Sequence, residues 1–151
     1  KLYSDECEVA TLHFDTCAKP LHTLQKVALP NCRSLLAVGY RNGKEVARHR
    51  VIAPEAPSKI TIEPSECGVK LGKEDQIFVY VRLQDKNNTT IPTTGGEVRL
   101  TVEGDAVIEG KAVAPLRAGV ASFIIRTGSR GGEIGLSAKY NNLSASTITK
   151  F

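Results

Sequence analysis

The sequence predicts an all-β protein made of two consecutive immunoglobulin-like antiparallel β-sandwich modules, residues 1–55 and 57–151. Apolar and polar side chains alternate strictly from Gln76 to Gln84, and a period of two buries one face of a strand. Two strand-like runs flank Asn42-Gly43, a pair typical of the two-residue type I′ turn. Pro54 and Pro57, with fixed φ angles and no N–H donor, end sheet pairing and stiffen the link between the modules.

The first module is predicted to hold short strands separated by residues that interrupt sheet pairing. These strands are Glu8 to Phe14, Thr23 to Leu29, Leu35 to Tyr40 and Glu45 to Ile52. Asp15-Thr16, Lys19-Pro20 and Pro30-Asn31 supply the breaks, because they compete for backbone hydrogen bonds or lack a donor. A piece of about 55 residues buries only about 60% of its unfolded surface. We therefore expect this module to gain stability by packing against its neighbour or against parts of the chain outside this sequence.

The second module is predicted to be an immunoglobulin-like sandwich of about seven strands, with little or no helix. Its first strand starts at Lys59 and is interrupted by Pro64. Further alternating runs lie at residues 76–84, 97–103, 120–126, 133–139 and 144–151, divided by Gly and Asn. Turns at intervals of about 8 to 12 residues are typical of such a sandwich. The expected core consists of Val98, Leu100, Val102, Phe123, Ile125, Ile134 and Leu136.

Charge and hydropathy argue against nucleic-acid and membrane partners. Twenty Lys and Arg against sixteen Asp and Glu give a net charge of +4, with both signs interspersed as on a solvated surface. The densest basic stretch is Arg41, Lys44, Arg48, His49 and Arg50, and only Tyr40 lies nearby for stacking. No run approaches about 20 apolar residues. We expect neither nucleic-acid binding nor a membrane span.

The four cysteines do not form a compact disulfide framework. Cys7, Cys17 and Cys32 precede the joint and Cys67 follows it, so full pairing would require a bridge between the modules. We expect mostly buried or free thiols, with one bridge inside the first module as the alternative. The sequence opens without an initiator Met or signal peptide, which leads us to expect a piece of a larger chain. A periplasmic or secreted location is slightly favoured over a cytoplasmic one.

One group of residues invites a metal-site hypothesis. His13, Asp15 and Cys17 would share one face of a continuous strand, and His22 is close in sequence. Asp15-Thr16 has the character of a turn, which would break that face, and no C-x-x-C or H-x₃-H pair supports the site. We therefore predict no metal ion and no cofactor.

The sequence also indicates no catalytic residue. The acidic residues lie at strand edges, at strand ends or on faces that alternate with the core, where they are solubilising. They are Asp5, Glu6, Glu8, Glu97, Glu103, Asp105, Glu109 and Glu133. No nucleophile elbow is present, and the glycine-rich residues 128–132 lack a phosphate-loop ending, which favours a hairpin loop.

Sugar binding and glycosylation have weaker signals. Trp is absent, and Tyr3, Tyr40, Tyr80 and Tyr140 are scattered along the sequence rather than grouped as a platform for sugar rings. Three N-x-[ST] triplets begin at Asn87, Asn88 and Asn142, and we interpret them as chance occurrences in Asn-rich turns.

The order of several segments resembles the C-terminal part of bacterial glycoside hydrolase family 2 enzymes, the β-galactosidases in particular. Residues 36–47 (LAVGYRNGKEVA), the joint 53–57 and the strand 59–62 are similar to a small β-module and linker of those enzymes. Residues 96–104 (GEVRLTVEG), 106–110 (AVIEG), 118–123 (AGVASF) and 132–138 (GEIGLSA) are similar to their closing immunoglobulin-like domain. Residues 1–33 fit less well, since they lack the family's Asn-Gly hairpin.

The resemblance implies an accessory piece of an enzyme of carbohydrate metabolism. In such enzymes the catalytic glutamates lie in an upstream (β/α)₈ barrel, so no catalytic residue carries over to this sequence. The expected role is to support the barrel, to shape the active-site rim or to make oligomer contacts. The expected partners are the upstream catalytic domain and, through the parent enzyme, further copies or carbohydrate. Two alternatives stay open: a tandem repeat of a bacterial surface adhesin, and an independent carbohydrate-binding module.

Overall fold

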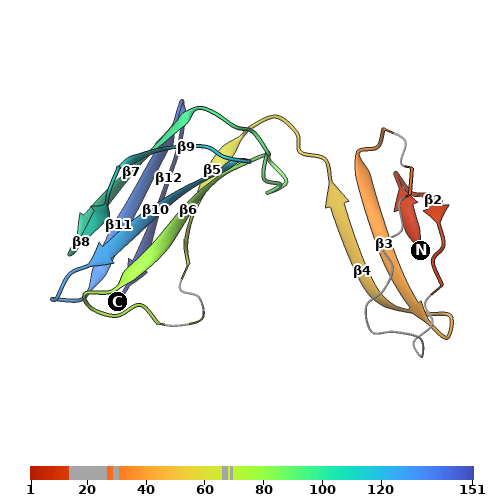
Figure 1. Cartoon of the computed structure of the whole chain (residues 1–151), viewed down its shortest axis with the longest axis horizontal. Coiled ribbons are helices and arrows are strands. Elements are labelled where there is room, and N and C mark those ends of the chain that lie inside the picture. The colour runs from red at the N-terminus through yellow and green to blue at the C-terminus, as the bar shows by residue number, and fades with distance from the viewer. Residues whose placement is uncertain (14–26, 29–30, 66–67, 69) are drawn as a thin grey trace. The chain divides into compact units, whose positions relative to one another are not determined.

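Strands are the only regular elements of the computed structural model, which describes residues 1–13, 27–28, 31–65, 68 and 70–151 (Figure 1). The chain divides into two compact units, Lys1–Ala53 (unit 1) and Pro54–Phe151 (unit 2). Every strand pair is antiparallel, and this confirms the all-β antiparallel fold class.

Unit 1 contains one four-stranded sheet over its described residues. In sheet order its strands are β2 (Cys7–Ala10), β1 (Leu2–Ser4), β3 (Ser34–Arg41) and β4 (Lys44–Ile52). The two strands expected around Asn42-Gly43 are confirmed as β3 and β4. Asn42 and Gly43 have φ angles of 52° and 75°, as a type I′ turn requires.

The start of unit 1 differs from the expectation. Strand β1 was missed because Asp5-Glu6, which closes the β1–β2 hairpin, contains neither Asn nor Gly, although both residues have positive φ angles of 45° and 74°. The Asp5 carboxylate accepts hydrogen bonds from the backbone N–H groups of Arg33 and Ser34, which ties this turn to the start of β3. The expected strand from Glu8 to Phe14 ends at Ala10, and residues 11–13 are not strand.

Of the strand expected from Thr23 to Leu29, only Val27 and Ala28 are described, and neither is in a strand. The remainder of that segment, with Phe14, lies outside the described residues.

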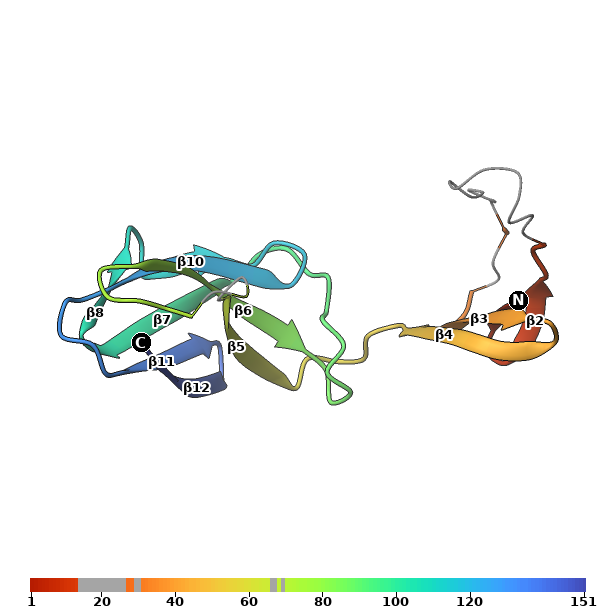
Figure 2. The same ribbon diagram turned by 90° about the horizontal axis from the view of Figure 1, so that it is seen from below.

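Unit 2 is a sandwich of two four-stranded sheets, seen as two layers in Figure 2. One sheet has the order β5 (Lys59–Ser65), β6 (Gln76–Gln84), β10 (Val120–Thr127), β8 (Ala106–Glu109). The other has the order β12 (Leu143–Lys150), β11 (Glu133–Tyr140), β7 (Glu97–Gly104), β9 (Val113–Pro115). The short strands β8 and β9 were not expected.

The core of unit 2 lies between its sheets and follows the predicted alternation. Six of the seven expected core residues are buried, and Val102 packs half-buried against them. From β6 the side chains of Ile77, Val79, Val81 and Leu83 are buried, so the strict period of two does mark the inward face of this strand.

Two expectations about chain breaks in unit 2 are wrong. Strand β5 continues through Pro64 to Ser65, because β5 lies at a sheet edge, where a residue without an N–H is tolerated. Residues 128–132 do not form a hairpin loop. They join β10 to β11, which belong to different sheets, and so carry the chain from one layer to the other.

The joint between the units is held to unit 2 by a buried carboxylate. Asp85 is fully buried and accepts hydrogen bonds from the backbone N–H groups of Glu55 (3.0 Å), Asn87 (2.8 Å) and Thr89 (2.8 Å). These bonds, that of Glu55 foremost, hold the pKa of the Asp85 carboxyl below its usual value. Glu55 therefore belongs with unit 2, whereas the sequence placed it in the first module.

Candidate interaction surfaces

The residues of the metal-site hypothesis are not brought together among the described residues. His13 is exposed, while Asp15, Cys17 and His22 lie outside the described residues. Within the ranges that the structure describes, no group of three or more His, Cys, Asp or Glu side chains is placed to hold a metal ion. Cys7 is an exposed free thiol and Cys32 a half-buried free thiol, as the expectation of buried or free thiols allows. Cys17 and Cys67 lie outside the described residues.

Several acidic side chains serve as structural acceptors. In unit 2 the Asp105 carboxylate binds the backbone N–H of Arg130 at 2.8 Å and its guanidinium at 3.1 Å. These contacts, with the guanidinium bond largest, hold the pKa of Asp105 below its usual value. In unit 1 the backbone N–H groups of Arg33 and Ser34 hold the pKa of Asp5 below its usual value. Carboxylates kept ionised in this way are poorly suited to donate protons as a general acid.

Two arginines of the basic stretch, Arg48 and Arg50, line a cavity in unit 1. Tyr3, Leu36 and Arg50 lie side by side across β1, β3 and β4, and Arg48 is two residues from Arg50 on the same face of β4. Together with Glu6 these residues surround a cavity of about 410 Å³. The sequence analysis pointed to Arg48 and Arg50 but did not place Tyr3 beside them.

The tyrosines of unit 1 are paired in space, although they are far apart in the sequence. A hydrogen bond with Tyr40 raises the pKa of the Tyr3 hydroxyl. The guanidinium of Arg48 binds the carboxylate of Glu45 through two nitrogens, at 2.9 and 3.0 Å. Unit 1 therefore has the Tyr3 and Tyr40 rings near an arginine, Arg48, whose charge is balanced by Glu45.

Unit 1 exposes much apolar surface for its size. Among its described residues Val38 is the only buried apolar side chain. Every residue of β4 is exposed, including Val46 at 59% and Val51 at 55%. A sheet that buries so little apolar surface has marginal stability alone. Such exposed apolar surface is typical of a sheet that packs against another part of a protein.

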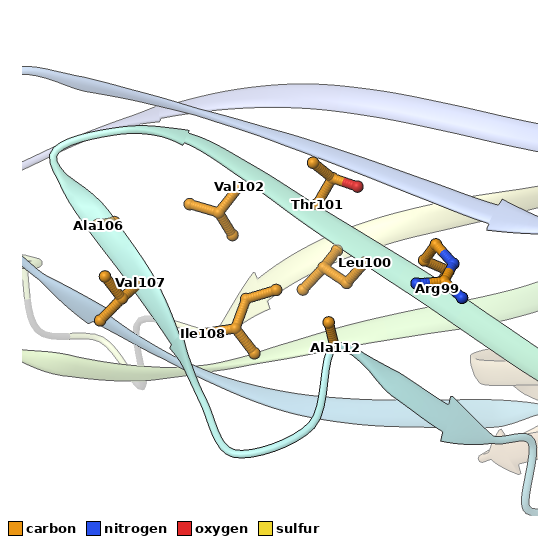
Figure 3. Close-up of a pocket in the computed structure, with 8 residues that line it drawn as sticks. All are labelled: Arg99, Leu100, Thr101, Val102, Ala106, Val107, Ile108 and Ala112. Atoms are coloured by element: carbon orange, nitrogen blue, oxygen red, sulfur yellow. The ribbon is translucent and has the colours of Figure 1, made fainter.

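A second cavity, of about 390 Å³, lies at the edge of the unit 2 sandwich between β7 and β8 (Figure 3). Leu100, Val102, Ile108 and Ala112 line its apolar floor. Strand β9 pairs with β7 only from Glu97 to Arg99, so the later part of β7 faces β8 without a strand between them. The cavity holds no titratable side chain except Arg99, so it offers no acid–base chemistry.

The outward face of β6 carries two aromatic rings that sequence reasoning missed as a pair. The rings of Phe78 and Tyr80 are parallel to within 6°, with centroids 6.2 Å apart. The Arg82 guanidinium lies 5.8 Å from the Tyr80 centroid and binds Glu63 on β5 at 2.7 Å. The period of two places Phe78, Tyr80 and Arg82 on one face, and that signal was available in the sequence.

The part of the chain that the structure describes contains no helix, and so no helix long and apolar enough to cross a membrane.

A family model and two curated relatives connect this chain with glycoside hydrolases. The family model described as "Glycoside hydrolase family 2 C-terminal domain 5" matches residues 60–149. A β-galactosidase of Rhizobium radiobacter is 24% identical over 112 residues, which are 74% of this chain and 81% of that protein. A β-galactosidase of Thermoanaerobacter pseudethanolicus is 29% identical over 109 residues, 72% of this chain but only 15% of that protein.

A solved structure extends the likeness to both units. A glycosyl hydrolase family 2 member from Bacteroides cellulosilyticus matches with a TM-score of 0.79 and 21% identity. The match covers 97% of this chain and 22% of that chain. The fold of both units is thus the fold of a small part of a much longer protein.

Proposed function

Because this chain belongs to the glycoside hydrolase family 2 C-terminal domain 5 family, we propose that it is the non-catalytic C-terminal region of a β-galactosidase-like enzyme. The family match covers residues 60–149, more than half of the chain. The parent would hydrolyse the O-glycosyl bond of β-galactosides with residues upstream of this region. This chain itself would contribute no catalytic residue.

The exposed apolar surface of unit 1 carries the proposed structural role. Val46, Val51 and Tyr40 are exposed in a sheet whose described residues bury a single apolar side chain. Covering such side chains with a neighbouring domain removes apolar area from water, at about 25 cal/mol per Å². We therefore assign unit 1 to packing against the catalytic region of the same chain. Contacts at the active-site rim or between copies of the enzyme are further parts of the same proposal.

The acidic residues support a non-catalytic assignment. Asp5, Asp85 and Asp105 each accept backbone N–H bonds, and the pKa of each carboxyl is lowered by those contacts or by Arg130. A glycosidase needs one carboxyl with a raised pKa to protonate the leaving oxygen. The pKa values of the Asp5, Asp85 and Asp105 carboxyls are shifted in the opposite direction.

A hydrolysis assay and the upstream coding sequence test the proposal. The purified chain should not hydrolyse a chromogenic β-galactoside, and turnover that survives a second purification would overturn the non-catalytic assignment. The upstream sequence should specify a barrel with two acidic residues at strand ends. Further sandwich repeats in its place would instead identify a surface adhesin.

A further inference from the structure

Strand β4 gives the unit 1 sheet a long edge without a partner (Figure 1). It has nine residues, whereas the opposite edge strand, β2, has four. Proteins usually shorten their edge strands, bulge them or interrupt them with Pro, because free N–H and C=O groups can pair with another strand. From Ala47 to Ile52 the register of β4 with β3 is unbroken, and this stretch contains no Pro. We call the outer side of this stretch, which no described strand covers, the β4 edge.

One hydrogen bond shows which backbone groups of the β4 edge are free to pair. The N–H of Ala53, the residue after β4, donates to the C=O of Arg33 at 2.7 Å, on the side of β3. Backbone groups alternate in direction along a strand, so the N–H and C=O groups of Arg48, Arg50 and Ile52 point away from β3. A further strand would therefore find donors and acceptors at the spacing of a β-ladder.

A cavity lies on the same face as the side chains of these residues. Arg48 and Arg50 line it together with Tyr3, Leu36 and Glu6. A strand beside β4 would carry every second side chain over this face. Strand addition takes its affinity from main-chain hydrogen bonds and its specificity from pockets for alternate side chains, and the β4 edge offers both.

The hairpin of β3 and β4 carries an excess of positive charge. Its residues 41–52 hold four Lys and Arg against a single carboxylate, Glu45. Glu45 is already bound to Arg48, and Arg50 has only a distant carboxylate, that of Glu6 at 3.9 Å. Carboxylates on an arriving strand would complement this excess.

The same charges disfavour a second copy of this chain at the β4 edge. Antiparallel pairing of two copies about His49 would set Arg48 opposite Arg50. Pairing about either arginine would set that arginine opposite its own copy. Like charges directly opposite each other on paired strands are destabilising.

We propose that the β4 edge binds an extended segment with acidic side chains, which adds to the unit 1 sheet as a further strand. Its backbone bonds to Arg48, Arg50 and Ile52, and its carboxylates lie beside Arg50. That the segment belongs to the upstream catalytic region of the parent enzyme rests on the proposed function. Unit 1 is then joined to that region by a continuous sheet as well as by side-chain packing.

Hydrogen exchange at single amides, in the 151-residue chain and in the full-length parent enzyme, tests the proposal. In the 151-residue chain the amides of Arg48, Arg50 and Ile52 should exchange rapidly, while those of His49 and Val51, which face β3, should be protected. In the parent the three outward amides should exchange at least about tenfold more slowly, because each gains a hydrogen bond.

Two pairs of variants of the parent separate backbone pairing from charge. Ile52→Pro removes one outward N–H without changing the charge, and it should restore rapid exchange at Arg50, whereas Ile52→Ala should not. Arg50→Glu should speed exchange at Arg48 by about twofold to fivefold, since an exposed ion pair is lost, and Arg50→Lys should not. In the 151-residue chain Ile52→Pro and Ile52→Ala should have the same thermal midpoint, because that N–H has no partner there.

Several outcomes would refute the proposal. Rapid exchange of the outward amides in the parent would show that no strand is added. Slow exchange in the 151-residue chain would show that the β4 edge is already covered, by a second copy if the slowing grows with concentration. Equal exchange in Arg50→Glu and the unsubstituted parent would remove the acidic segment.

These results are distinguishable from failure of the proposed function. Protected amides in a parent without a catalytic barrel would leave the β4 edge occupied and remove only the accessory role. A catalytic barrel upstream with freely exchanging amides would remove only the added strand.

Discussion

Replacing Leu136 by Ala tests whether unit 2 folds around its own core, separately from unit 1. Leu136 lies in β11, fully buried between the two sheets. Truncation removes apolar atoms from the core and leaves a cavity, which costs about 2–5 kcal/mol in buried Leu→Ala changes. Unit 2 has about 100 residues, for which about 1 kcal/mol shifts the midpoint by about 4–8 °C. A loss of about 3 kcal/mol would therefore lower it by about 12–24 °C.

Calorimetry of the whole chain provides the assay. We propose that the two units are separate modules, as the division after Ala53 suggests. Leu136→Ala should therefore lower the midpoint of the unit 2 transition and leave that of the unit 1 transition in place. Val38→Ala should shift the other transition, and Ile148→Ala, at an exposed position on the neighbouring strand β12, should change stability by less than about 0.5 kcal/mol. A Leu136→Ala change that moves both transitions together, or a loss below about 1 kcal/mol, would refute the reasoning.

Two further predictions concern the exposed sheet and the joint. Val51→Lys should leave the thermal midpoint of the isolated chain unchanged, because Val51 is exposed there. The same substitution should lower the thermal midpoint of the full-length parent enzyme, because it would place a charge in the proposed contact. Equal midpoints of the parent with and without the substitution would contradict this prediction. The lowered pKa of Asp85 means that its carboxylate stabilises the fold above the ordinary value of 3.8, and that this contribution disappears as pH falls through the lower folded pKa. Urea unfolding should therefore find Asp85→Asn less stable than the unsubstituted chain at pH 7, with the difference shrinking at acid pH; a constant difference would argue against the assignment.

Local periodicity was enough to predict much of unit 2. The inward side chains of β6, β7, β10 and β11 were found because an alternating pattern depends only on neighbours in the sequence. The hairpin at Asn42-Gly43 was found because positive φ at two consecutive positions strongly favours those residues. The family resemblance added the enzyme class, which the patterns alone did not contain.

Features that depend on distant partners were missed. The Asp5-Glu6 turn has two positive φ angles without a glycine, and its Asp5 carboxylate is held by N–H groups almost thirty positions away. The role of Asp85 is set by Glu55, thirty positions earlier. The stack of Phe78 and Tyr80 on β6 was overlooked because the tyrosines were considered without Phe78, and the position of Glu63 beside Tyr80 depends on strand register.

The prolines within two edge strands of unit 2 have a consequence for how the protein is made. Pro64 lies in β5 and Pro115 in β9, an edge strand of each sheet. A strand that lacks one N–H is a poor template for a strand arriving from another molecule. Nascent copies that emerge side by side from a polysome are thus discouraged from pairing through β5 or β9 before each sandwich has closed.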